Sequence, residues 1–342
     1  MRKQLACGII LIFVVVFSLS AAAPQYQLKQ KFTLGGDGGW DYLTYDSAGK
    51  RLFISRATRV QVVDPEKGTV TAEIANTPGV HGIALAQDLG KGFTSNGREN
   101  TVTVFDLKTL QETSRIKLDG AENPDAILYD SASKRVFTFN GRSKNASVID
   151  ATNSTVVATI PLDGKPEFAA ADGKGMVYVN IEDKSELTSI DARKAAVVNT
   201  WPLTGCEEPS GLAMDQKHRR LFSGCGNKVM AITNADTGKV ITTVPIGQGV
   251  DANGFDPGTE LAFSSNGDGT LTVVHEDSAD KYTVAQNADT QRGARTMALN
   301  PDNHEVYVVT AEFDEAPPAP GQTRPRRTMK PGTFTLLVMT KK

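Results

Sequence analysis

The sequence predicts an all-β fold, a seven-bladed β-propeller with four-stranded blades. Three observations predict it. An aromatic residue recurs at a nearly constant spacing, each interval holds four short β-rich runs, and the N-terminal segment resembles the one run that the last interval lacks. Repeats of roughly 40–50 residues made of short strands are typical of propellers, in which one repeat forms one blade. The aromatic residues, 40 to 44 positions apart, are Phe53, Phe93, Phe137, Tyr178, Phe222, Phe263 and Tyr307.

The first repeat shows how each run can serve as a strand. A first run ending at Tyr45 is followed by the turn-forming segment 46–50, and a second run over 51–55 carries the aromatic residue. Residues 60–63 and 70–74 supply the third and fourth runs. In several repeats the third run ends in an aspartate, whose carboxylate can accept hydrogen bonds from the backbone of the next turn. We therefore expect a structural role for these residues, which are Asp64, Asp106, Asp150 and Asp191.

The repeated aromatic residues are expected to lie between neighbouring blades. Blades pack face to face, and one large side chain at the same depth in each would fill the space between neighbours. Burying such a ring is worth roughly 2–3 kcal/mol.

The two ends of the chain predict that the N-terminal strand closes the last blade. The final repeat reaches residues 333–338 and has no fourth run before Lys342. Residues 27–36 read like a fourth strand, and the stretch 31–35 resembles the stretch 243–247 of an earlier blade. An open ring would leave strand edges unpaired. Residues 23–342 are therefore expected to form a single closed propeller domain.

Short segments around the aromatic residues resemble the Tyr-Val-Thr-Asn (YVTN) repeat family of bacterial β-propellers. The matching tetrads are Phe-Thr-Ser-Asn at 93–96, Phe-Thr-Phe-Asn at 137–140 and Phe-Ser-Ser-Asn at 263–266. The resemblance covers nearly all of the chain after residue 22. It implies the propeller fold and an exported bacterial protein. It implies no activity, because such repeats share packing residues rather than catalytic groups.

Residues 1–22 are predicted to be a cleaved signal peptide. Arg2 and Lys3 precede an apolar run from 5 to 19, and small residues follow at 20–23, with cleavage expected near Ala22. The alternative is a retained N-terminal anchor. We expect a periplasmic or secreted monomer with no transmembrane segment after removal of this peptide. The full chain has a net charge of −2, which makes nucleic acid an unlikely partner.

Removal of the signal peptide leaves two cysteines, Cys206 and Cys225. They flank neighbouring strands of the fifth repeat at the same end of the blade. An even number of cysteines in an oxidising compartment favours a disulfide bond. Metal or redox chemistry is the alternative.

The repeat also identifies the residues at one mouth of the central channel. Counting back 12 residues from each aromatic, or 11 in the second and fourth repeats where we expect shorter turns, reaches the loops that enter the innermost strands. The immediate neighbours of the first two of these positions are Trp40 and His81. The rim positions are Asp41, Gly82, Asp125, Glu167, Ser210, Asp251 and Arg295.

Three interpretations of this rim remain open. It can be a hydrated polar surface with no ligand. It can bind a hard cation such as Ca²⁺ or Mg²⁺, for which carboxylate oxygens are suitable ligands; that set would be Asp41, Asp125, Glu167 and Asp251. It can bind a small molecule or peptide, and that set would be Trp40, Asp41, His81, Asp125, Glu167, Asp251 and Arg295.

An insertion of 19 residues interrupts the last repeat at about 312–332. It contains a proline-rich stretch at 316–320 and then Arg324, Arg326, Arg327 and Lys330. Proline-rich segments tend to stay extended, so we expect a solvated loop. The functional alternative is a basic flap that leans over the acidic rim or recruits an acidic partner.

No motif in the chain identifies a reaction. A phosphate-binding loop, a nucleophile elbow, a His-Glu-x-x-His zinc motif and an EF-hand loop are all absent from the sequence. We therefore expect a non-enzymatic scaffold, without a cofactor unless Ca²⁺ or Mg²⁺ occupies the rim, that binds a small ligand or an envelope protein.

Two other functions remain open. One is a metal-assisted hydrolase such as a lactonase, in which Glu167 or Asp251 holds the ion, His81 acts as base and Arg295 orients the substrate. The other is an accessory subunit of a periplasmic redox system.

Overall fold

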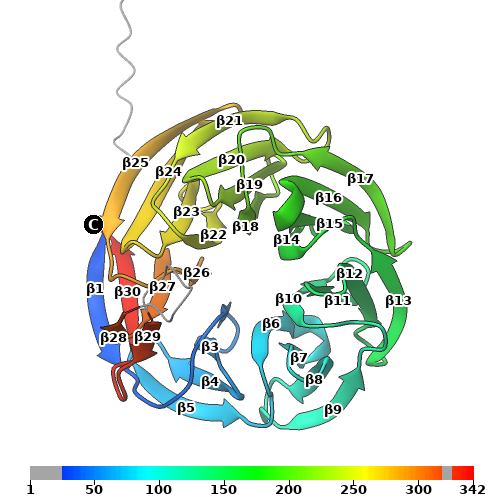
Figure 1. Ribbon diagram of the computed structural model, residues 1–342, viewed down its shortest axis with the longest axis horizontal. Coiled ribbons are helices and arrows are strands. Elements are labelled where there is room, and N and C mark those ends of the chain that lie inside the picture. The colour runs from blue at the N-terminus through cyan, green and yellow to red at the C-terminus, as the bar shows by residue number, and fades with distance from the viewer. Residues whose placement is uncertain (1–24, 318–325) are drawn as a thin grey trace, which may run out of the picture.

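A computed structural model describes residues 25–317 and 326–342, and within them the chain forms a ring of seven four-stranded antiparallel sheets (Figure 1). The predicted fold class is confirmed. The predicted signal peptide, residues 1–22, lies outside the described residues. Two short 3₁₀ turns, η1 (Gln87–Leu89) and η2 (Glu182–Lys184), occur in the second and fourth blades.

Each blade runs from an innermost to an outermost strand. Blades 1 to 3 consist of β2 (Leu43–Asp46), β3 (Arg51–Arg56), β4 (Arg59–Asp64) and β5 (Thr69–Ile74); β6 (Val80–Ala86), β7 (Lys91–Asn96), β8 (Thr101–Asp106) and β9 (Glu112–Lys117); β10 (Pro124–Asp130), β11 (Arg135–Asn140), β12 (Asn145–Asp150) and β13 (Thr155–Pro161). Blades 4 to 6 consist of β14 (Pro166–Ala171), β15 (Met176–Ile181), β16 (Glu186–Asp191) and β17 (Ala196–Pro202); β18 (Pro209–Asp215), β19 (Arg220–Cys225), β20 (Val229–Asn234) and β21 (Val240–Pro245); β22 (Val250–Asp256), β23 (Leu261–Asn266), β24 (Thr270–Ser278) and β25 (Lys281–Asp289).

The seventh blade joins the two ends of the chain, as predicted. Its strands are β26 (Met297–Asn300), β27 (Glu305–Thr310), β30 (Thr335–Lys341) and β1 (Tyr26–Thr33), in that order from the centre. The N-terminal strand β1 pairs antiparallel with β30 along its whole length. It ends at Thr33, so that residues 34–40 cross from the last blade to the first.

A buried arginine fixes this crossing segment. Arg56 is fully buried, and its guanidinium donates hydrogen bonds of 3.0–3.2 Å to the backbone carbonyl oxygens of Gly35, Asp37 and Gly38. It also lies 3.7 Å from the ring centre of Phe334 in the last blade. Hydrogen bonds from a charged donor are stronger than neutral ones, so this one side chain holds the first and last blades in register.

The seven repeated aromatic residues lie between blades, as predicted. Each is at most 1 % exposed. Each belongs to a separate apolar cluster that also contains residues of the next blade. Phe53, for example, packs with Ile83 and Phe105 of the second blade, and Tyr307 packs with Leu52 of the first. The repeated packing thus builds one interface seven times.

The asparagine that ends each matching tetrad is structural. Asn96 is fully buried, and its Nδ2 donates to the hydroxyls of Thr101 and Thr103 at 3.1 and 2.9 Å, while its Oδ1 accepts from Thr94 at 3.0 Å. Asn266 makes the same three kinds of contact, and Asn140 does so with the amide oxygen of Asn145 in place of one hydroxyl. A buried amide whose donors and acceptor are hydrogen-bonded fixes the positions of the residues around it. This structural role accounts for the recurring asparagine without a bound ligand.

A disulfide bond replaces this asparagine in the fifth blade. Cys225 pairs with Pro209 as Asn140 pairs with Pro124, and it is joined to Cys206. The predicted disulfide is therefore confirmed. It ties the loop that enters the innermost strand to the end of the second strand.

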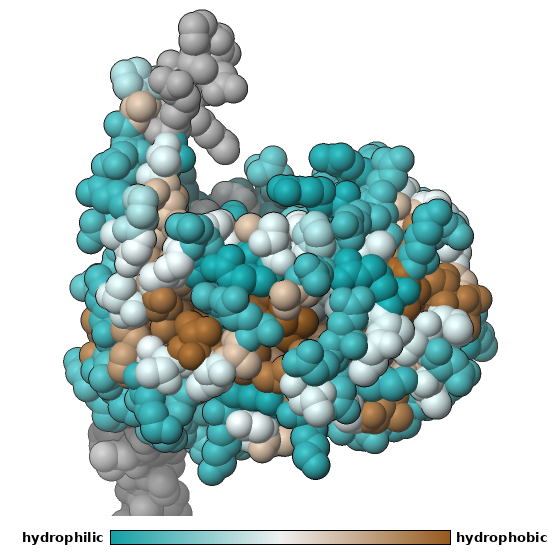
Figure 2. All heavy atoms as spheres, turned by 90° about the horizontal axis from the view of Figure 1, so that it is seen from below, coloured by the Kyte–Doolittle hydropathy of each residue, from teal (hydrophilic) through white to brown (hydrophobic). Residues whose placement is uncertain are grey.

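The insertion at 312–332, expected to be a solvated loop, contains a β-hairpin at its two described ends. Strand β28 (Phe313–Ala316) pairs with β29 (Arg326–Met329), and residues 318–325 lie outside the described residues. Packing explains the difference: the Arg327 guanidinium lies 4.2 Å from the ring centre of Phe313, whose ring is 6.0 Å from Trp40. Figure 2 shows the hairpin projecting from one face of the disc.

The disulfide should contribute measurably to stability. The bond closes a loop between residues 19 positions apart, and closing a loop of this size stabilises by roughly 3 kcal/mol in the chain-entropy model. Replacing both Cys206 and Cys225 by Ser should lower the free energy of unfolding by about that amount, measured by guanidinium titration. A reductant should lower the midpoint of the wild-type protein and leave that of the double variant unchanged. Equal unfolding midpoints for the wild-type protein and the double variant in the absence of reductant would contradict this prediction.

Candidate functional site

Five innermost strands are bulged at the positions that the sequence places on the rim. The register breaks after Val80, Pro124, Pro166, Pro209 and Val250, at the start of β6, β10, β14, β18 and β22. A bulge leaves an extra residue unpaired, bends the strand and re-aims side chains. In each of these blades the residue after the break is the one that reaches the channel mouth.

The structure corrects the rim register in the second blade. Val80 pairs with Asn96 as Pro124 pairs with Asn140, so His81 is the residue equivalent to Asp125. Gly82 is the next residue inward, and a Cβ atom there would lie 2.7 Å from Ile127. The expected shorter turn is not present, because η1 fills the connection between β6 and β7.

Polar side chains of one blade hold the rim backbone of the next. The Ser95 hydroxyl donates to the carbonyl oxygen of Asp125, and the Ser265 hydroxyl donates to that of Arg295 at 2.6 Å. Both serines are the third residue of a tetrad and are fully buried. The tetrads therefore position rim residues across the blade interface.

The rim encloses a cavity of about 560 Å³, here called the acidic pocket. The sequence identified six of its residues by register, and its Lys165, Glu182 and Glu208 come from connections between strands that the repeat does not specify. The polar and aromatic residues that line the pocket are Asp41, Tyr42, Asp125, Lys165, Glu167, Phe168, Glu182, Glu208, Ser210, Gln248, Asp251 and Arg295.

Two stacked aromatic rings line the acidic pocket. Tyr42 and Phe168 have ring centres 4.6 Å apart and planes inclined by 23°. Each directly follows a rim residue, at a position where most other blades have a small residue; this is the signal that sequence reasoning missed. The Tyr42 hydroxyl is buried without a hydrogen-bond partner among the described residues. Burial and then the carboxylates, that of Asp125 foremost, raise the pKa of Tyr42 well above its usual value.

His81 lies between two carboxylates. Its Nδ1 is 2.5 Å from Asp41 Oδ2 and 3.6 Å from Asp125 Oδ1, and one donor atom of each of the three residues lies within 4.8 Å of the others. Burial lowers the pKa of His81, but the hydrogen bond to Asp41 and the charge of Asp125 outweigh it and raise the pKa overall. Burial raises the pKa of Asp125, against the lowering effect of His81.

Glu167 lies in a second group, around Lys165. The Lys165 ammonium is 2.5 Å from both Glu167 Oε1 and Glu182 Oε2. Burial and the charge of Asp125 raise the pKa of Glu167, while Lys165 acts to lower it. One ammonium is thus shared between two carboxylates.

The third group pairs the sixth and seventh blades. Arg295 Nη1 is 3.5 Å from Asp251 Oδ1, and the arginine side chain is 53 % exposed whereas the aspartate side chain is 16 % exposed. Burial raises the pKa of Asp251 to about 7 despite this arginine. The carboxylate is therefore only weakly compensated.

Trp40 does not line the acidic pocket. Its ring packs against Phe334 at 5.1 Å, and it lines a separate cavity of about 240 Å³ together with Phe313 and Arg327 of the hairpin. Arg295 borders both cavities. The residues predicted as one ligand-binding set therefore do not all line one cavity. Trp40 lines the smaller cavity beside the hairpin, and the rim carboxylates line the acidic pocket.

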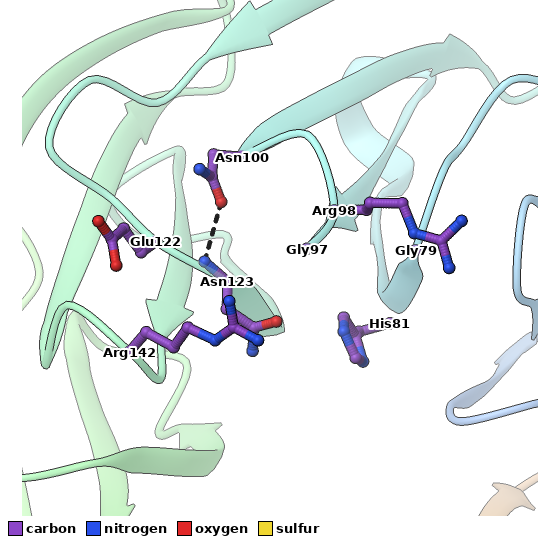
Figure 3. A pocket seen from close by; sticks show the side chains of 8 residues that line it. All are labelled: Gly79, His81, Gly97, Arg98, Asn100, Glu122, Asn123 and Arg142. Atoms are coloured by element: carbon purple, nitrogen blue, oxygen red, sulfur yellow. Dashed lines mark hydrogen bonds between the residues drawn. The ribbon is translucent and has the colours of Figure 1, made fainter.

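A third cavity, of about 590 Å³, lies on the other side of His81 (Figure 3). Arg98 and Arg142 line it, and Figure 3 shows the guanidinium of Arg142 beside Asn123, whose backbone N–H donates to Asn100. His81 thus separates a cavity with two exposed arginines from the acidic pocket.

Comparisons with known proteins agree with the fold and identify no activity. A search of protein-family models finds no match. A protein of Salmonella typhi named "Uncharacterized protein YncE" is 26% identical over 187 residues, and the same match occurs with its Salmonella typhimurium counterpart. The matched stretch covers 53% of this chain and spans only about half the length, 52%, of these relatives. The YVTN resemblance remains a prediction.

Solved structures with low sequence identity share the propeller fold. A chain of the crystal structure of the mitotic checkpoint complex matches with a TM-score of 0.72 at 16% identity, covering 87% of this chain and 95% of that one. The structure of U3-55K matches with a TM-score of 0.74 at 7% identity, covering 92% and 99%. Among the described residues, no helix has the length and apolar character needed to cross a membrane.

The chemistry of the acidic pocket is that of an anionic host with an aromatic wall. Its carboxylates are more numerous than its fixed cations, and buried carboxylates without compensation are costly. Such a site can take up protons, a metal ion or an organic cation.

The stability of the protein should depend on pH through Asp251. Its folded-state pKa lies above the unfolded value, so the folded state binds the proton more tightly. The stabilisation from this group is complete below the unfolded pKa and is lost as pH rises through about 7. Asp251→Asn should therefore raise the free energy of unfolding at pH 8 by on the order of 1 kcal/mol and flatten its pH dependence between about pH 4 and 7. Asp119→Asn, at an exposed position, is the control, and identical pH profiles for wild type and Asp251→Asn would contradict the assignment.

Proposed function

We propose that this chain is an exported, monomeric, non-enzymatic scaffold that binds an organic cation in the acidic pocket. The cation is an amine or guanidinium group, carried by a small molecule or by a basic side chain of an envelope protein. The observation that supports this most directly is the charge of the pocket. Two fixed cations, Lys165 and Arg295, face six carboxylates, which are Asp41, Asp125, Glu167, Glu182, Glu208 and Asp251.

The pocket has the other features of a cation site. The pKa of Asp251 is raised, so its ionised form is disfavoured in the empty pocket. A cation that enters the pocket stabilises the ionised carboxylate by direct charge attraction. The stacked Tyr42 and Phe168 offer aromatic surface, and a cation close to an aromatic face is stabilised by about 0.5–2 kcal/mol.

Two observations support export. The Cys206–Cys225 disulfide is of a kind that persists in oxidising compartments and is rare in the cytosol. Residues 1–22 have the charge and hydropathy pattern of a signal peptide. Together they favour a periplasmic or secreted location.

Titration calorimetry with spermidine as probe tests the proposal. The wild-type protein should bind spermidine with an affinity that falls as salt rises, because screening weakens the attraction between charges. The double variant Asp125→Asn/Glu167→Gln removes two pocket charges and should bind at least about tenfold more weakly. Asp119→Asn/Glu66→Gln removes two exposed charges outside the pocket and should bind like wild type. Equal affinities for the pocket variant and wild type, or no spermidine binding, would refute the proposal.

A metal-assisted hydrolase is the second candidate, and the Asp41–His81–Asp125 group supports it. One donor atom from each residue lies within 4.8 Å of the others, and imidazole with carboxylates can hold a divalent ion. The ion-holding role considered for Glu167 moves to Asp41 and Asp125 in this arrangement, because Glu167 pairs with Lys165. His81 would then be a ligand rather than the base.

Lactone hydrolysis tests this candidate. The purified protein should hydrolyse a simple lactone after addition of Ca²⁺, Mn²⁺ or Zn²⁺, and His81→Ala should abolish the activity. Activity that is absent with every ion, or unchanged in His81→Ala, would exclude the hydrolase.

A further inference from the structure

A second group of metal-ligating side chains lies away from the acidic pocket. Asp215 ends β18, at the opposite end of that strand from the rim residue Ser210. His218 is in the turn that follows, and Glu276 comes from β24 of the sixth blade. The group therefore joins the fifth and sixth blades.

The three side chains are close together and two of them are buried. His218 Nδ1 lies 2.8 Å from Asp215 Oδ2 and 3.0 Å from Glu276 Oε1. The carboxylate side chains are 2 % and 1 % exposed, whereas the imidazole is 29 % exposed. One donor atom from each residue lies within 4.8 Å of the others. An ion can therefore reach the two buried carboxylates from the partly exposed side of the group, at His218.

The carboxylate of Glu276 is only partly hydrogen-bonded within the described part of the chain. Its Oε1 contacts His218 Nδ1 and, at 3.4 Å, the Tyr282 hydroxyl, but its Oε2 is buried with no hydrogen-bond partner among the described residues. A buried, unpartnered carboxylate oxygen is costly. Such an atom, beside an imidazole and a second carboxylate, is able to act as a ligand to a cation.

The repeat shows that the blade does not need a glutamate here. The backbone N–H of Glu276 donates to Glu260 O, and the equivalent residues of four other blades make the same bond to the residue before the second strand. Those equivalent residues are buried and apolar: Leu107, Ala151, Ala192 and Ala235. The sixth blade therefore departs from the pattern at the point where a charge is least tolerated.

Among the residues that the structure describes, no neighbouring lysine or arginine forms an ion pair with Asp215 or Glu276. The nearby Arg220 guanidinium donates to the carbonyl oxygens of Ala279 and His218 and pairs with Asp280, which occupies its donors. A protonated His218 would still leave one net negative charge in the group.

We infer that Asp215, His218 and Glu276 bind a single divalent transition-metal ion, with zinc the best match, that links the fifth and sixth blades. Imidazole favours zinc over calcium or magnesium, and carboxylates complete common zinc sites. Ligands of a tetrahedral zinc are about 3.3 Å apart, given zinc–donor bonds of about 2.0–2.2 Å. The separations of 2.8 and 3.0 Å from His218 Nδ1 need only a small expansion to admit the ion.

Zinc uptake by matched variants tests the inference. All proteins carry His81→Ala, so that the rim imidazole does not contribute, and all are stripped with EDTA. After equilibrium dialysis against zinc, the His81→Ala protein should retain one zinc per chain and show a raised Tm, since an ion that binds only the folded state stabilises it. Adding Glu276→Ala, the residue that three other blades have, should weaken zinc binding at least about tenfold and remove the rise in Tm. Adding Glu260→Gln, at an exposed neighbouring position, should change neither.

His218→Gln provides a second variant if Glu276→Ala does not fold, and it should also lose zinc. Two results would overturn the inference. One is that the stripped His81→Ala protein binds no zinc. The other is that Glu276→Ala, or His218→Gln, binds zinc with unchanged affinity. Because this site is remote from the acidic pocket, its outcome is independent of cation binding at the rim.

Discussion

The pairing of β1 with β30 is the constraint on which the rest of the structure depends. It supplies the outer strand of the last blade and covers the edge that an open ring would expose. It also affects the rim, because Arg295 enters the last blade and Asp41 enters the first, and the crossing segment held by Arg56 carries the chain from one of these blades to the other. The relative position of Asp41 and Arg295 in the acidic pocket therefore depends on this junction.

The regular and irregular parts of each repeat have different roles. Buried aromatic residues and tetrad asparagines recur because every blade interface needs the same contacts. Their side chains are buried and are not accessible to a ligand. The rim residue, by contrast, differs in type from blade to blade, from His81 to Glu167 to Arg295, while bulges and neighbouring serines keep its position fixed. Variation at a fixed position is how one scaffold can present a specific set of charges.

The sequence was sufficient for the ring and insufficient for the details of its mouth. Spacing of aromatic residues predicts blades because each interface repeats one packing contact, and the match between 31–35 and 243–247 predicts closure for the same reason. Register placed Asp125 and Asp251 correctly but missed by one residue at His81, because the connection occupied by η1 keeps its full length. Lys165 and the hairpin depend on contacts between segments that no repeat encodes. His218 lies in a turn, and the sequence does not indicate that Glu276 of the next blade lies beside it.

Closure by the first strand has a consequence for the order of folding. Tyr26 contacts the carbonyl group of His304 across 278 positions of the chain, so β1 is synthesised long before the strand that it pairs with. Contacts so distant in sequence form slowly, since the chain must first lose the entropy of a very long loop. The earlier blades can pack on one another one after another, whereas β1 waits as a single strand. The segment made first is thus among the last to find its place, and until then the half-formed ring exposes edges that favour association with other chains.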